Sequence, residues 1–144
     1  MRLRKIWLLC NLVCIIPGAF AQQFIHPGVL HSEKSLERIK RLVDQKAQPA
    51  YGSYEILAKL PEARADYQMK GPFEIISRDG KYGYTKGPSE RDFNSAYYNA
   101  LLWKITGKKA HADKSMEIIR AYARTVRQIP PTNDAPLCAG LQGF

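Results

Sequence analysis

The sequence predicts an all-α protein made of helical hairpins, with one long loop among them. In four separate stretches the apolar residues recur every three or four positions, which is the spacing of one face of a helix. Between about residues 65 and 90, glycine and proline interrupt the chain every few positions, which excludes helix over most of that segment. A short extended piece is expected only at 73–77, and no sheet is predicted.

The first two predicted helices follow each other closely. The first helix begins near Ser32 or Ser35, either of which can cap it, and Pro49 ends it. A second helix starts near Ala50 and is limited by Pro61. Their apolar faces consist of Leu36, Ile39, Leu42 and Val43 in the first helix and of Tyr51, Tyr54, Leu57, Ala58 and Leu60 in the second.

The strongest helical pattern spans 92–106, and a further helix is predicted at 109–126. Gly107 is expected to end the first of these helices as a C-terminal glycine. Because the connection is so short, the two helices are expected to form an antiparallel hairpin. Asp92 is interpreted as an early-turn residue that complements the helix dipole.

The apolar faces of this hairpin are wider than one partner helix needs, so further helices are expected around them and the chain is interpreted as truncated. Tyr97 and Trp103 are expected in the core. The full faces are Phe93, Ala96, Tyr97, Ala100, Leu101 and Trp103 in one helix, and Ala112, Met116, Ile119, Tyr122, Ala123 and Val126 in the other.

Residues 1–21 are predicted to be a secretory signal peptide. Three basic residues precede an apolar run at 6–16, and Ala19 and Ala21 fit a cleavage site with the cut after Ala21. The apolar run is well below the ~20 residues needed to cross a bilayer, so no stable membrane anchor is expected. The mature chain, 22–144, is therefore expected to be periplasmic or secreted.

Cleavage would leave a basic chain with a single cysteine, Cys138, which rules out an intramolecular disulfide. The leader carries three of the 22 basic residues, so the mature net charge is 19 − 13 = +6. A basic exported protein often meets a polyanion. Export argues against nucleic acid and leaves membrane surfaces and acidic polysaccharides as polyanions. A solvated basic surface without a dedicated partner remains the alternative.

Three segments together resemble the N-terminal part of the alginate lyase family. They are 24–30, 94–107 and 112–119, and 138–143 resembles the segment that leads into the family's next helix. The resemblance implies an (α/α) toroid, incomplete in this chain, around a groove that holds alginate or a related polyuronate. It also implies cleavage by β-elimination, in which Asn, His or Arg neutralises the uronate carboxylate while Tyr or His transfers protons.

No catalytic residue is assigned. In the family an Asn-His pair, an Arg and a Tyr follow on later helices, and this sequence contains no Asn-His pair. The expected function is that of an exported polyuronate lyase, present here as an N-terminal fragment that is inactive alone. The alternative is an exported helical-repeat module that binds an acidic glycan or a protein partner.

Candidate substrate-binding residues lie in the long loop and on the helix that follows it. Cations in the loop can pair with uronate carboxylates and tyrosines can stack on sugar faces, and the resemblance implies a lid there. A solvated, mobile loop is the alternative, and the helix residues can instead serve packing or capping. The candidates are Arg78, Lys81, Tyr82 and Tyr84 in the loop, and Asn94 and Tyr98 on the helix.

The three histidines do not predict a metal site. His26 and His31 have no carboxylate or cysteine partner nearby, so structural hydrogen bonding is expected for them. His111 stands near a helix start and is predicted to be a surface residue. No metal and no cofactor are predicted.

Overall fold

The computed structural model describes residues 30–130, and this part of the chain is mostly helical. Within it there is no strand, and the single β-type pairing is a parallel bridge between Ile75 and Gln128. The all-α prediction is therefore confirmed for these residues. The predicted leader, the segments at 24–29 and 138–143, His26 and Cys138 lie outside the described residues.

The helices are α2 (Glu33–Asp44), α3 (Ala50–Lys59), α4 (Lys86–Thr106) and α5 (Lys109–Thr125), with short 3₁₀ helices η1 (Pro61–Ala63) and η2 (Gly80–Thr85).

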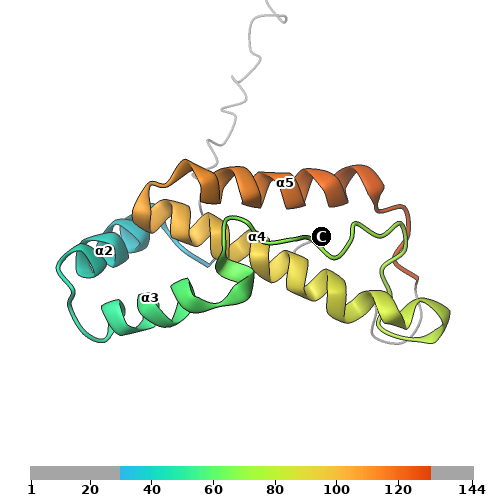
Figure 1. Cartoon of the computed structure of the whole chain (residues 1–144), viewed down its shortest axis with the longest axis horizontal. Helices are drawn as coiled ribbons and strands as arrows, with labels where there is room; N and C mark the ends of the chain where they lie inside the picture. Colours follow the sequence, from blue (N-terminus) through green and yellow to red (C-terminus); the bar gives the residue numbers. More distant parts are fainter. Residues whose placement is uncertain (1–29, 131–144) are drawn as a thin grey trace, which may run out of the picture.

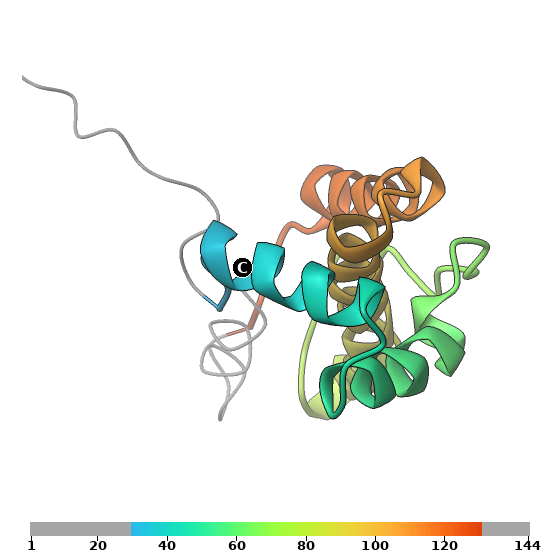
Figure 2. The same cartoon turned by 90° about the vertical axis from the view of Figure 1, so that its left-hand side faces the viewer.

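The first helix, α2, begins after Ser32, whose side chain accepts a hydrogen bond from the backbone N–H of Ser35. Of the two capping candidates, Ser32 is therefore the cap. The second helix, α3, begins directly after Pro49, as predicted. Both helices lie beside the end of α4 that leads into α5 (Figures 1 and 2), and Lys40 Nζ donates to the carbonyl of Ile105 at 3.3 Å there.

The two long helices, α4 and α5, lie side by side in both views (Figures 1 and 2). They run antiparallel, because Phe93 near the start of α4 packs on Tyr122 near the end of α5, and Asn99 further along α4 bonds to His111 at the start of α5. Gly107 ends α4 with φ of 71°, as predicted. Within residues 30–130, no helix is long and apolar enough to span a bilayer.

The prediction of a continuous loop from 65 to 90 is wrong at its C-terminal end. Gly80–Thr85 forms the 3₁₀ helix η2, and α4 begins at Lys86 rather than at Asp92. The Gly87-Pro88 pair does not prevent this, because the N–H groups of a first helical turn have no partner within the helix and proline is tolerated there. The extended piece expected at 73–77 is reduced to the bridge at Ile75.

A small apolar core joins α4, α5 and the segment between η1 and η2. It consists of Tyr67, Ile76, Ala96, Ile118 and Tyr122. The prediction that Tyr97 and Trp103 lie in the core is wrong, since they are 40% and 39% exposed. Met116 and Ile119 of the predicted α5 face are also exposed. Both helices are turned from the predicted orientation because the buried face of α4 is largely polar.

Candidate functional site

The buried face of α4 carries a line of polar residues. Ser89, Asp92, Ser95 and Asn99 are each 0% exposed. Their spacing of three, three and four residues places them on one side of the helix. We refer to these four residues as the polar seam. Every fully buried side-chain polar atom of the described residues has a hydrogen-bond partner, so the seam is satisfied throughout.

Asp92 of the seam accepts several hydrogen bonds. The prediction that it is an early-turn residue is wrong, because α4 begins six residues before it, at Lys86. Its Oδ1 accepts hydrogen bonds from Tyr67 Oη at 2.9 Å and from the N–H of Lys70 at 2.8 Å. Its Oδ2 accepts from the N–H of Gly71 at 2.8 Å and from Tyr122 Oη at 2.7 Å. Four donors therefore stabilise a carboxylate that has no solvent contact.

The two tyrosines that bond to Asp92 hold their protons firmly. Burial, the hydrogen bond to Asp92 and the charge of that carboxylate all raise the pKa of Tyr67 and of Tyr122 above the ordinary value for tyrosine. Both hydroxyls therefore remain donors at neutral pH. A tyrosine that serves as a general base needs the opposite shift, so these two side chains are suited to a structural role.

Asn99 is the second residue of the seam that forms several hydrogen bonds. Its Nδ2 donates to the carbonyls of Ser95 and Glu62 at 2.9 Å and 3.2 Å, with Arg64 O a further acceptor at 3.4 Å. Its Oδ1 lies 2.7 Å from Nδ1 of His111. An amide oxygen only accepts, so Nδ1 of His111 carries the proton.

The prediction that His111 is an ordinary surface residue is therefore wrong. Its ring is partly buried between α4 and α5, and burial followed by the charge of Lys108 lowers its pKa. His31 behaves as expected, because its Nε2 lies 2.8 Å from Tyr97 Oη and the two rings stack.

A pocket of about 590 Å³ opens next to the polar seam. Most of its wall comes from one irregular segment, 61–70, and α4 adds Arg91. The seam holds this segment near both ends, since Asn99 binds the carbonyls of residues 62 and 64 and Asp92 binds the groups of residues 67, 70 and 71. The residues that line the pocket are Pro61, Glu62, Arg64, Asp66, Tyr67, Gln68, Lys70 and Arg91.

The pocket is rich in charge. Arg64, Lys70 and Arg91 supply three cations against the two carboxylates of Glu62 and Asp66. Lys70 Nζ also lies 5.9 Å from the centre of the Tyr67 ring. Guanidinium and ammonium groups around an open cavity can bind carboxylates by charge-assisted hydrogen bonds. Among residues 30–130, no group of three His, Cys, Asp or Glu side chains is placed to hold a metal ion.

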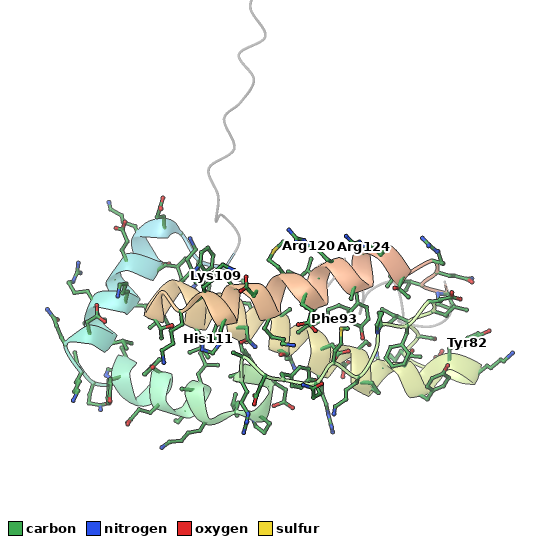
Figure 3. All side chains as sticks on the ribbon, turned by 45° about the horizontal axis from the view of Figure 1, so that its top comes forward. Tyr82, Phe93, Lys109, His111, Arg120 and Arg124 are labelled. Carbon is green, nitrogen blue, oxygen red and sulfur yellow. The ribbon has the colours of Figure 1, made fainter. Side chains whose placement is uncertain are left out.

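The candidate residues of the loop lie together, but not in this pocket. Arg78 precedes η2, and Lys81, Tyr82 and Tyr84 belong to it. Lys81 Nζ lies 5.4 Å from the ring centre of Tyr82, while the exposed Tyr84 ring meets Phe73 edge to face. Tyr82 is at one end of the helix pair and His111 is towards the other (Figure 3).

The candidate residues of α4 stand closer to the pocket. Asn94 and Tyr98 follow Arg91 by three and seven positions, so all three lie on one side of α4. Of the three, only Arg91 lines the pocket. The polar seam itself was missed by the sequence analysis, although a line of Ser, Asp, Ser and Asn at helical spacing was present as a signal.

No family, curated protein or solved structure is found to match the chain. The resemblance to alginate lyases therefore stays a prediction that rests on the sequence segments alone.

Proposed function

We propose that this is an exported, alginate-lyase-like protein and that the pocket beside the polar seam binds the carboxylates of an anionic polysaccharide such as alginate. The observation that supports binding most directly is the presence of Arg64, Lys70 and Arg91 around one open cavity. A uronate polymer carries one carboxylate on each sugar, so several cations along a groove can bind successive residues. The resemblance supplies the substrate class and the toroid arrangement of this proposal, and the predicted signal peptide supplies export.

The face of α4 beyond Arg91 extends the proposed site. Asn94 and Tyr98 offer an amide and an aromatic ring on the same side of the helix. Such groups can bond to sugar hydroxyls and pack on sugar faces. The proposed ligand is therefore a chain rather than a single sugar.

We assign binding, and no proton transfer, to the described residues. β-Elimination requires a base that removes the C5 proton, yet Tyr67 at the pocket has a raised pKa and its hydroxyl is bonded to Asp92. These facts favour a second candidate function, which is binding of an acidic glycan without cleavage. The two candidates differ in whether unsaturated uronate ends are released.

Binding can be tested by titrating the purified protein with polymannuronate and polyguluronate, with dextran as the neutral control. Arg91→Ala should weaken binding by about two- to fivefold, the effect of losing an exposed ion pair. Arg120→Ala is the matched control, because Arg120 lies on the outer side of α5 (Figure 3). Equal losses in the two variants, or equal binding of dextran, would contradict the assignment of the pocket.

Cleavage is followed in the same samples by the ultraviolet absorbance of unsaturated uronate ends. We expect binding without an increase in absorbance. A clear increase that is lost in Tyr67→Phe would show that the hydroxyl bonded to Asp92 takes part in the chemistry, and the assignment of binding alone would be wrong.

A further inference from the structure

The guanidinium of Arg64, in the wall of the pocket, is already bonded to a carboxylate. Its Nε donates to Asp66 Oδ1 at 2.8 Å and its Nη2 donates to Asp66 Oδ2 at 2.7 Å. Two parallel hydrogen bonds of this kind are the arrangement by which arginine recognises carboxylates in general. The Arg64 and Asp66 side chains are 65% and 69% exposed, so a dissolved carboxylate has access to the same guanidinium edge.

We propose that Asp66 is an internal competitor for the carboxylate position of Arg64, and that a uronate carboxylate replaces it when a polysaccharide binds. This inference rests on the proposed function. Replacement breaks two N–H···O hydrogen bonds and forms two of the same kind, so the bonding of Arg64 is conserved. Besides Arg64, Lys114 of α5 also lowers the pKa of Asp66, although Lys114 is itself paired with Glu117.

The competition has a consequence for the class of ligand. A single carboxylate gains little at Arg64, because the contact that it forms equals the contact that it displaces. Lys70 and Arg91 line the same pocket. Neither of them takes part in the ion pairs found among the described residues. A polymer that reaches these cations at the same time can displace Asp66, so the site selects polyuronates over uronate monomers.

The experiment compares two variants with the same chemical change. Asp66→Asn removes the competing charge, and Asp44→Asn removes the charge of another exposed pair, Lys40 with Asp44 on α2. Asp66→Asn should tighten binding of polymannuronate oligomers by about two- to fivefold, the range that exposed ion pairs contribute. Asp44→Asn should change binding by less than about 1.5-fold at physiological salt, because screening limits distant charges.

A double variant tests whether the gain acts through Arg64. In an Arg64→Ala background, Asp66→Asn should give no larger gain than Asp44→Asn. If the gain persists without Arg64, Asp66 acts by general repulsion and the competition is refuted. Equal effects of Asp66→Asn and Asp44→Asn in the wild-type background would refute it too.

Nuclear magnetic resonance of the Arg64 Nε–H group separates this inference from the proposed function. If glucuronate at high concentration shifts this resonance but no polyuronate binds, the exchange of carboxylates at Arg64 stands, while the polysaccharide assignment and the preference for polymers fail. If polyuronate binds while the Arg64 resonance stays fixed, the proposed function stands and the exchange fails. Absence of both signals refutes both.

Discussion

The replacement of Asp92 by asparagine is the most informative single change in the described part of the chain. Asn has nearly the same shape as Asp, but it lacks the charge and has one oxygen in place of two. Asp92 accepts four hydrogen bonds, two at each oxygen. If the amide nitrogen takes the place of Oδ2, it faces the N–H of Gly71 and the hydroxyl of Tyr122.

The N–H of Gly71 and the hydroxyl of Tyr122 differ in whether they can accept a hydrogen bond from the new amide. The Tyr122 hydroxyl can rotate and accept from the new amide, whereas the N–H of Gly71 can only donate. A buried N–H without an acceptor costs about 1–3 kcal/mol, and each remaining bond loses charge assistance of up to about 1 kcal/mol. Removal of a desolvated charge offsets part of this loss. We therefore expect Asp92→Asn to lower the free energy of unfolding by about 2–4 kcal/mol.

Urea unfolding followed by circular dichroism measures this loss, and thermal unfolding should show a midpoint lower by roughly 10–20 °C for a domain of this size. Asp113→Asn is the control, because Asp113 pairs with Lys109 on the surface and should change stability by no more than about 0.5 kcal/mol. A loss at Asp92 below about 1 kcal/mol would refute the role of its four hydrogen bonds.

Three further predictions concern the same network. Gly71→Ala should destabilise the protein by at least about 2 kcal/mol in urea unfolding, because its Cβ would overlap the hydroxyl of Tyr122. Asn99→Ala should cost about 2–3 kcal/mol and weaken polyuronate binding, since it leaves the carbonyl of Glu62 without its donor and His111 without its acceptor. The raised pKa of Tyr122 means that the folded state keeps a proton that the unfolded state releases above about pH 10. The contribution of Tyr122 to stability is therefore full below that pH and falls by about 1.4 kcal/mol per pH unit above it, and Tyr67 contributes in the same sense. Tyr122→Phe should reduce this alkaline slope and Tyr84→Phe should not; equal slopes in the two variants would contradict the assignment.

The local features of the helices were predictable from the sequence. Ser32 caps α2 and Gly107 ends α4 with a positive φ, because each acts within a few residues of the turn that it stabilises. Pro49 directly precedes α3, as predicted. The prediction that Pro49 ends the first helix is wrong, because α2 already ends at Asp44. Features of this kind depend on short-range geometry and need no knowledge of the fold.

The role of Asp92 was not predictable in the same way. An acidic residue near a helix start is ordinary, and its burial depends on donors that lie 21 to 30 positions away along the chain. His111 was misjudged for a similar reason, since its partner Asn99 is on the opposite helix. Tyr97 and Trp103 were predicted in the core because they lie on the apolar face of the helix, but α4 turns its polar seam inward and leaves them partly exposed.

The candidate site also differs between the sequence prediction and the structure. The cations and tyrosines of the segment at 78–84 were predicted to bind substrate, because the glycines there indicate a loop. The pocket instead forms at 61–70, which carries few turn residues and no motif. Its cations come together because the polar seam fixes the backbone there, and this is a tertiary effect.

The residues of the polar seam are polar because they bond to the irregular segment packed against them. A row of leucines at the four seam positions would bury α4 equally well, and buried polar groups are often less stabilising than apolar ones. Leucine, however, cannot bond to the backbone of residues 62–71, whose buried N–H and C=O groups have few partners in regular structure and still need them. Asp92 supplies acceptors for the N–H groups at 70 and 71, and Asn99 supplies a donor for the carbonyls at 62 and 64. Of the side chains that line the pocket, Tyr67 bonds to Asp92 and belongs to this frame. The other lining side chains take no part in these bonds and can change without loss of the frame, so ligand preference and stability can be altered separately.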